Sequence, residues 1–268
     1  CVDFSRMLID RSGYDREGFS AHYDRFRPRP PRALLDVLCR YARTDRPELV
    51  VDLGCGTGLS TRVWSRTAAR TVGVEPNPAM LDAAEPAPGV EYREAFAAET
   101  GLDDACADIV TCSQSLHWME PEPTLAEVTR ILRSGGVFAA YDYDWPPVVD
   151  PEVDEAFGSY QERRSELRRT LGIQKGADRW AKEEHLSRMR ASGRFRHCRE
   201  VLLHSIEEGG AERVGGFARS FGLPFADLAD EQVERALRID ELEAVALRVL
   251  GDRTVPFLFG YRVRVGVT

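Results

Sequence analysis

The sequence predicts an α/β protein built on a mostly parallel sheet with helices on both faces. Three observations predict this class. Between residues 49 and 143, short apolar segments alternate with helical segments, which is typical of parallel strands joined by crossover helices. A glycine-rich turn follows the first of these strands. The chain has 268 residues with 43% hydrophobic content, enough for one elaborated domain with a substantial core.

The elements are predicted in order along the chain. Residues 1–29 form a polar, irregular arm, and prolines end it before a helix predicted from apolar spacing at Ala33–Ala42. The next strands are expected at Leu49–Leu53, Thr71–Glu75, Val90–Glu94, Asp108–Ser113 and Val137–Tyr143. The helices between them are expected at Leu59–Ala69, Pro78–Glu85 and Pro123–Arg133. Ligands in such sheets bind beyond the carboxyl ends of the strands.

The glycine turn departs from the dinucleotide fingerprint G-x-G-x-x-G/A. Gly54, Gly56 and Gly58 leave the main chain open to a ligand, but the third glycine comes one residue early and Leu59 occupies its usual position. Asp52, two residues before the turn, would repel a pyrophosphate and suits a cationic group. These two departures disfavour a NAD(P)-binding oxidoreductase.

The second strand ends in a carboxylate. Glu75 can accept hydrogen bonds from a ribose diol. Together with Asp52, it indicates a ligand that is a nucleoside with positive charge and no phosphate. S-adenosylmethionine (SAM), with its ammonium and sulfonium groups, fits this description.

The segment from Val50 to Ser60, with Gly73-Val74-Glu75, resembles motifs I and II of the class I SAM-dependent methyltransferases. Asp108 to Trp118 and the residues up to Phe138 are similar to later motifs of the small-molecule branch that includes trans-aconitate methyltransferase. The resemblance implies a Rossmann-like fold with a seven-stranded sheet, whose antiparallel last strand lies between strands five and six. It also implies SAM as cofactor and S-adenosylhomocysteine as product.

The cofactor contacts come from several parts of the chain. The residues predicted to bind SAM are Tyr23, Arg27, Asp52, Gly54, Cys55, Gly56, Gly58, Glu75, Pro76, Met80, Phe96, Ala97, Ser113 and Gln114. Within this set, the resemblance assigns the methionine carboxylate to Tyr23 and Arg27. Many relatives carry Gly-Asp after the third strand, whereas this chain has Ala95-Phe96-Ala97. Adenine recognition is therefore expected to rest on backbone groups and on Phe96, with Met80 either a wall of the adenine pocket or plain core.

The second half of the chain is expected to complete the sheet and to cover the substrate. Two helices within Pro151–Gly193 form a lid in the place where the family inserts one, and strands follow at Phe195–Ile206 and Val255–Val267. A helix is expected over Asp230–Leu250, and Gly215–Phe221 forms a loop or short helix that walls the pocket. The predicted organisation is an arm at 1–29, a SAM-binding core at 30–145, a lid at 146–194 and completion of the core at 195–268.

The expected reaction is methyl transfer from SAM to a small molecule, most simply O-methylation of a carboxylate or hydroxyl of a metabolite or natural product. A carboxylate acceptor needs no base. For a hydroxyl acceptor His117 is the candidate base. Alternatively, His117 packs beside Trp118 and supports the loop. Arg164 interrupts an apolar helix face and could meet a substrate carboxylate. The residues predicted to bind substrate are Trp118, Tyr143, Trp145, Tyr160 and Arg164. The alternatives are C- or N-methylation, or a cyclase or decarboxylase that binds SAM without transferring methyl.

Composition disfavours several other classes. A formal net charge of −8 gives no basic footprint for nucleic acid, and the fourth strand lacks the segment typical of base-amine methylation. No apolar run approaches a membrane span, and the charged start is unlike a signal peptide, so a cytoplasmic monomer or homodimer is expected. The six cysteines are dispersed, which predicts free thiols and no metal site.

Overall fold

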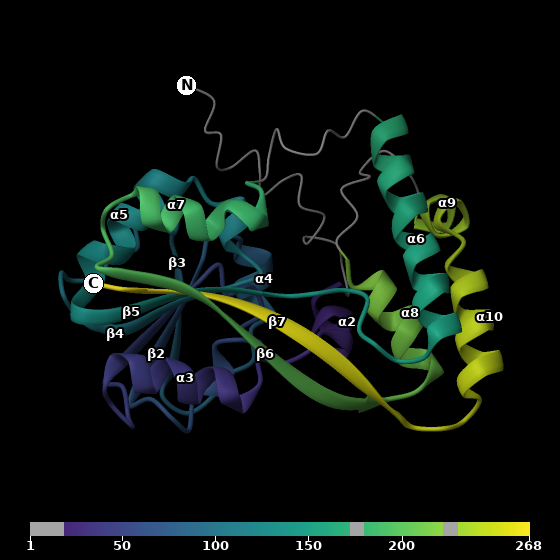
Figure 1. Cartoon of the computed structure of the whole chain (residues 1–268), viewed down its shortest axis with the longest axis horizontal. Helices are drawn as coiled ribbons and strands as arrows, with labels where there is room; N and C mark the ends of the chain where they lie inside the picture. The colour runs from purple at the N-terminus through teal and green to yellow at the C-terminus, as the bar shows by residue number, and fades with distance from the viewer. Residues whose placement is uncertain (1–18, 172–179, 222–229) are drawn as a thin grey trace. The chain divides into compact units, whose positions relative to one another are not determined.

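The computed structural model describes residues 19–171, 180–221 and 230–268. The chain divides into two compact units that are each built from three separate segments (Figure 1). Unit 1 consists of residues 1–28, 144–177 and 204–260, and unit 2 of residues 29–143, 178–203 and 261–268. Two long strands, β6 (His197–Gly209) and β7 (Val255–Val267), contribute residues to both units.

The strands of the described residues form a seven-stranded sheet in the order β3-β2-β1-β4-β5-β7-β6. The first five strands are β1 (Leu49–Leu53), β2 (Arg70–Glu75), β3 (Val90–Glu94), β4 (Ala107–Ser113) and β5 (Leu132–Tyr143). They pair in parallel, whereas β7 runs antiparallel to β5, from Val137 opposite Val267 to Tyr143 opposite Tyr261. The predicted mostly parallel sheet, with an antiparallel last strand between strands five and six, is confirmed.

Unit 2 has helices on both faces of its sheet. Figure 1 shows α5 (Pro121–Ile131) and α7 (His185–Ala191) on one face and α3 (Arg32–Ala42) on the other. The side under α5 is a continuous apolar core in which Leu53, Val110 and Phe138 are fully buried. The remaining helical segments described in unit 2 are η1 (Arg62–Trp64), α4 (Pro78–Asp82), η2 (Leu116–Trp118) and η3 (Lys182–Glu184). Because α3 and α5 pack on opposite faces of the central strands, they support the strand ends at which the candidate site lies.

The described residues of unit 1 form helices, together with its parts of β6 and β7. Its helices are α2 (Phe19–Phe26), α6 (Pro151–Thr170), α8 (Ala211–Arg219), α9 (Asp230–Leu237) and α10 (Ile239–Leu250), with α10 packed against both α6 and α8. Its core is aromatic: the ring of Phe217 lies 5.7 Å from that of Phe157 and 5.0 Å from that of Phe221.

Two predicted helices differ from the structure. In place of a helix over Leu59–Ala69 there is a single 3₁₀ turn, η1 (Arg62–Trp64), because the hydroxyls of Ser60 and Thr61 donate to Asp52 and compete with helical packing. The helix expected over Asp230–Leu250 is two helices, because Arg238 takes a left-handed conformation with φ of 53°. No glycine or proline marks that break in the sequence.

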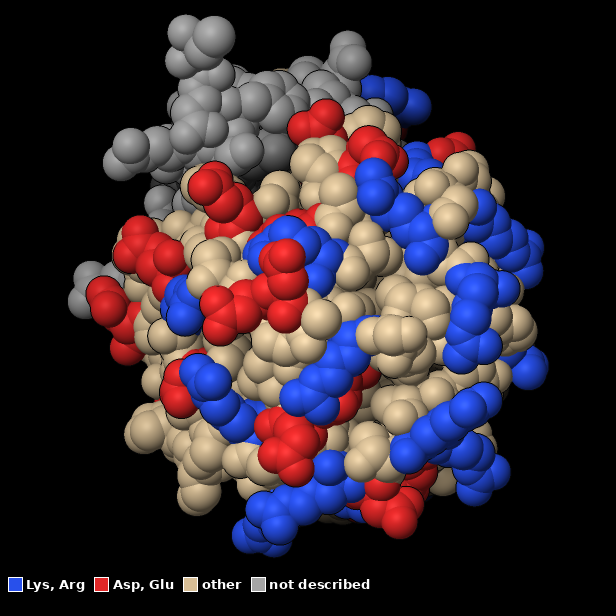
Figure 2. All heavy atoms as spheres, turned by 90° about the vertical axis from the view of Figure 1, so that its left-hand side faces the viewer, with Lys and Arg blue, Asp and Glu red and all other residues tan. Residues whose placement is uncertain are grey.

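Charges of both signs lie side by side on the face shown in Figure 2. On unit 2, Arg70 pairs with Glu91 at 2.7 Å and Arg133 pairs with Asp108 at 2.8 Å. An exposed pair such as that of Arg70 and Glu91 contributes little to stability.

The helices in the described part of the chain are all too short or too polar to cross a membrane.

Candidate functional site

The glycine turn follows β1 and has a backbone shape that requires glycine. Gly54, Gly56 and Gly58 have φ values of 66°, 54° and 80°, in the left-handed region that side chains rarely adopt. A Cβ on Gly54 would lie 2.7 Å from the Cβ of Ser115, and one on Gly58 would overlap the ring of Tyr92. A Cβ on Gly56 would meet only the end of the Met80 side chain, at 3.0 Å. Gly56 is therefore the glycine whose outer side has most room for a ligand.

Asp52 lies beneath the turn and is fully buried. One oxygen of its carboxylate accepts from Ser60 at 2.7 Å and Thr61 at 2.8 Å, and the other accepts from Thr111 at 2.8 Å. Burial raises the pKa of Asp52, and the three hydroxyl donors act in the opposite direction. The structure thus gives Asp52 a role in fixing the turn, while its contact with a cationic cofactor group stays a prediction.

Glu75 stands half-buried at the carboxyl end of β2, beside the turn. Its Oε2 accepts from the backbone N–H of Gly56 at 3.0 Å, and its Oε1 accepts from that of Asn77 at 3.0 Å. Burial raises the pKa of this carboxyl group, and the two backbone N–H groups oppose that effect. Each oxygen keeps lone pairs for further donors, so the carboxylate is held in place to receive hydroxyl groups.

Other predicted cofactor residues surround the turn within unit 2. Met80 is 5% exposed and its Cε faces Gly56, whereas Phe96, after β3, is 38% exposed and offers a free ring surface. Cys55 is buried beneath the turn, and burial raises the pKa of its thiol well above the usual value. Pro76 is half-buried and Ala97 is buried. The structure thus brings the predicted residues from β1, β2 and β3 to one edge of the sheet.

The segment after β4 packs on the same turn. Ser115 donates to the carbonyl of Leu53 at 2.7 Å, which fastens η2 to the end of β1. His117 is 7% exposed, its ring lies 5.4 Å from that of Trp118, and its carbonyl accepts from the Trp180 N–H at 2.7 Å. Ser113 is the last residue of β4.

Gln114 has a left-handed φ of 55° and its backbone N–H donates to the carbonyl of Tyr141 at 2.9 Å. Its side-chain Nε2 is buried without a hydrogen-bond partner in the described structure. Such an atom is expected where a ligand supplies the acceptor. The fixed Glu75 carboxylate, the open side of Gly56 and this amide fit a phosphate-free nucleoside with a polar tail.

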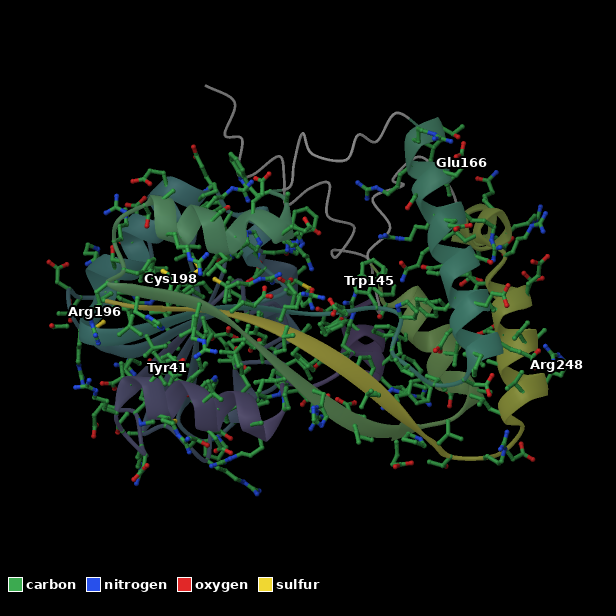
Figure 3. The ribbon with its side chains drawn as sticks, in the orientation of Figure 1. Tyr41, Trp145, Glu166, Arg196, Cys198 and Arg248 are labelled. Carbon is green, nitrogen blue, oxygen red and sulfur yellow. The ribbon has the colours of Figure 1, made fainter. Side chains whose placement is uncertain are left out.

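Unit 1 gathers five predicted residues into or around its aromatic core. Arg27 is 8% exposed, and its guanidinium lies 4.7 Å from the ring of Tyr23 and 4.5 Å from that of Phe221. Arg164 also faces the Phe221 ring, at 5.6 Å, and Trp145, labelled in Figure 3, stacks on it at 4.3 Å. Tyr160 is fully buried.

The tyrosines of the two units are held in different ways. The hydroxyl of Tyr160 donates to the carbonyl of Ala218 at 2.8 Å, which ties α6 to α8 in unit 1. Tyr143, in unit 2, is buried with its ring 5.9 Å from that of Tyr261.

Sequence reasoning missed several residues of the site. Tyr92 covers Gly58, and Lys182 donates to the Gln114 amide at 2.6 Å from a part of the chain nearly seventy residues later. The sequence offers one signal for Lys182, which is that lysine occurs at only two positions among 36 Lys and Arg residues. The described residues hold no group of three His, Cys, Asp or Glu side chains suited to a metal ion.

Comparison with known proteins agrees with this geometry. Residues 51–140, which run from β1 into β5, match the family model of the methyltransferase domain. The chain contains a class I SAM-dependent methyltransferase domain. The resemblance seen in the sequence is thereby confirmed.

The methyltransferase domain has both curated and structural relatives. A Saccharomyces cerevisiae protein assigned as a SAM-dependent methyltransferase is 32% identical over 162 residues, which are 57% of this chain and 55% of the relative. Trans-aconitate 2-methyltransferase of Azoarcus sp. is 36% identical over 133 residues, 46% of this chain and 51% of the relative. The chain spans about half the length of the curated relatives it matches.

A solved structure extends the likeness beyond the matched segment. It belongs to a protein of Anaeromyxobacter dehalogenans assigned as a type II methyltransferase. It has a TM-score of 0.66 and 26% sequence identity, and the alignment covers 90% of this chain and 98% of that one.

Proposed function

We propose that this protein transfers a methyl group from SAM to a small-molecule acceptor and releases S-adenosylhomocysteine. The observation that carries the proposal is the Glu75 carboxylate, held by two backbone N–H groups beside a left-handed glycine turn. It suits a ribose diol next to a backbone without side chains, and Asp52 under the turn argues against a pyrophosphate. SAM brings an already activated methyl group, so the protein has to orient the reactants and exclude water.

The cofactor roles follow the order of the strands. Glu75 would take the ribose hydroxyls, Met80 and the exposed ring of Phe96 would border the adenine, and Ser113 and Gln114 would lie toward the methionine part. The family resemblance implies that Tyr23 and Arg27 would bind the methionine carboxylate.

Calorimetry with S-adenosylhomocysteine tests the cofactor assignment. Wild type should bind, Gly56→Val should abolish binding, and Glu75→Ala should weaken it by about 1.5 to 3 kcal/mol, the usual range for hydrogen bonds to a charged group. Glu91→Ala is the control, because Glu91 is an exposed carboxylate on β3 that pairs with Arg70. Tight NADH binding without binding of S-adenosylhomocysteine would overturn the assignment.

For the acceptor we propose a carboxylate or hydroxyl on a partly apolar molecule. Support comes from unit 1, where the guanidinium of Arg164 lies over the ring of Phe221, on which Trp145 also stacks. Such a cluster suits an organic acid, since a guanidinium binds a carboxylate and the rings bind its carbon skeleton.

A panel of organic acids and matched alcohols, assayed for S-adenosylhomocysteine release, tests the acceptor class. With a responding acid, Arg164→Ala should raise KM while leaving cofactor affinity unchanged. Arg169→Ala is the control on the same helix, because Arg169 is exposed and paired with Glu166. If only alcohols are methylated, the proposal that the acceptor is a carboxylate is wrong.

For a hydroxyl acceptor we propose His117 as the general base. Its place after β4 is at the carboxyl edge of the sheet, where ligands of such sheets bind. His117→Ala should lower kcat by about 10²- to 10⁴-fold and leave the affinity for S-adenosylhomocysteine unchanged. A parallel loss of stability and cofactor affinity would instead assign His117 a bracing role beside Trp118.

A further inference from the structure

Lys182 is a partly buried member of a polar network in unit 2. Its ammonium donates to Oε1 of Gln114 at 2.6 Å and pairs with Oδ1 of Asp142 at 2.6 Å. The other oxygen of Asp142 accepts from Arg264 at 2.7 Å, and the Nε of Arg264 lies 3.0 Å from Glu200. Because Asp142 and Arg264 are 9% and 4% exposed in their side chains, this anchor has little freedom to move.

The ammonium determines how the Gln114 amide is turned. An ammonium group only donates hydrogen bonds, so the amide must present its oxygen to Lys182 and its NH₂ in the opposite direction. That Nε2 is buried and has no hydrogen-bond partner in the described part of the chain. A buried donor without an acceptor is unfavourable, and the left-handed backbone of Gln114 adds further strain. The unpaired Nε2 and the left-handed backbone are both understandable if a bound ligand accepts a hydrogen bond from the amide.

The strand order indicates which part of the ligand lies there. From the edge of the sheet the order is β3, β2, β1, β4, with Phe96 after β3, Glu75 at the end of β2 and Gln114 after β4. A nucleoside that places its base near Phe96 and its ribose at Glu75 extends its amino-acid tail toward Gln114. In the methionine part of SAM, the ammonium and sulfonium cannot accept an N–H, so its carboxylate is the group that can.

We propose that Lys182 is a positioning residue, which holds the Gln114 amide so that Nε2 donates to the α-carboxylate of the cofactor. This inference rests on the proposed function. Lys182 shares the Asp142 carboxylate with Arg264, and this pairing keeps the ammonium in place beside the amide. A lysine suits this place because its compact ammonium reaches an amide and a carboxylate at once, whereas a guanidinium is larger and planar.

Calorimetry with two nucleosides tests the proposal. S-adenosylhomocysteine carries the amino-acid tail, and 5′-methylthioadenosine lacks it. Gln114→Leu should weaken S-adenosylhomocysteine binding by about 10- to 100-fold, as expected for a hydrogen bond to a charged group. Lys182→Met should weaken it by about 3- to 30-fold, because the amide remains but is no longer oriented. Both variants should bind 5′-methylthioadenosine within about twofold of wild type.

Two further variants sharpen the experiment. In the double variant the effect of Lys182→Met should disappear, since it acts through Gln114. Arg188→Ala is the matched control: Arg188 donates to the carbonyl of Ala181 at 2.9 Å and lies over Trp180, so it supports the same segment without reaching the amide. It should leave the affinities for both nucleosides unchanged.

Equal weakening of both nucleosides by Lys182→Met would show a structural role and overturn the proposal. Unchanged or tighter binding of S-adenosylhomocysteine would overturn it as well. If wild type binds neither nucleoside, the proposed function itself fails. If wild type binds both and Lys182→Met does not discriminate between them, only the positioning role fails.

Discussion

The hydroxyl of Thr111 on β4 donates to the carboxylate of Asp52 on β1 at 2.8 Å, between two residues that stand opposite each other in the sheet. The other oxygen of the same carboxylate holds Ser60 and Thr61, beyond the glycine turn. One buried side chain therefore fastens the segment after the turn to the two central strands.

Replacing Asp52 should destabilise the protein strongly. In Asp52→Ala the hydroxyls of Ser60, Thr61 and Thr111 lose their acceptor while buried, so the free energy of unfolding should fall by about 2 to 4 kcal/mol. Urea unfolding measures this, and Asp36→Ala, at an exposed residue paired with Arg32, is the control. A loss no larger than that of the control would contradict the role of Asp52 as an anchor.

Gly58→Ala should also destabilise, for two separable reasons. The new Cβ would overlap Tyr92, and alanine would be forced to a φ of 80°, which costs about 1 to 2 kcal/mol by itself. Adding Tyr92→Leu should recover the first loss and leave the second. The control is Gly158→Ala in α6, where the added Cβ meets nothing within 4 Å and should be neutral or stabilising. Thermal unfolding should give the lowest midpoint for Gly58→Ala, a higher one for Gly58→Ala with Tyr92→Leu, and the highest for wild type and Gly158→Ala.

Acid should weaken the protein through His185. This residue is 2% exposed beside Asp142, Lys182, Arg188 and Arg264, and burial lowers its pKa to about 4. The unfolded chain binds the proton more readily, so the stabilising contribution is complete above about pH 6.5 and is lost as the pH falls toward 4. The lost contribution amounts to about 3 kcal/mol. His185→Gln should show a shallower decline in urea unfolding over that range, and a decline as steep as that of wild type would exclude His185 as its source.

Arg27 should contribute to the stability of unit 1. Its guanidinium faces three aromatic rings and donates to the carbonyl of Ser220 at 2.7 Å. Arg27→Met should lower the free energy of unfolding by about 1 to 3 kcal/mol, because the Ser220 carbonyl loses a charged donor. Arg25→Met, at an exposed residue paired with Glu212, should change it by less than about 0.5 kcal/mol. Similar losses in the two variants would show that the buried guanidinium does not stabilise unit 1.

Patterns within one segment predicted much of the fold. The bounds of β1, β3 and β7 agree with the predicted ones, because apolar runs and strict alternation mark Leu49–Leu53, Val90–Glu94 and Val255–Val267 directly. The left-handed turn at Gly54, Gly56 and Gly58 also agrees with its sequence. The helix expected after the turn is absent because side-chain hydrogen bonds from Ser60 and Thr61 back to Asp52 decide the local structure.

The candidate site was predictable only in part, because some of its contacts join distant parts of the chain. Glu75 was identified because it ends a strand and Gln114 because it follows one, and strand ends can be read from the sequence. The link from Lys182 to Gln114 and Asp142 depends on how residues 178–203 return to the sheet, which no local pattern records. The clash that reserves Gly58 for glycine likewise comes from Tyr92, on another strand.

The position of β7 has a consequence for how the protein is made. Residues 261–267 pair with β5 and complete the sheet between β5 and β6, yet they follow β5 by more than a hundred residues in the chain. Until they emerge from the ribosome, the nascent chain holds Val137–Tyr143 with an open edge, a known template for misassembly. Removing residues 261–268 should therefore yield insoluble protein rather than a smaller working enzyme.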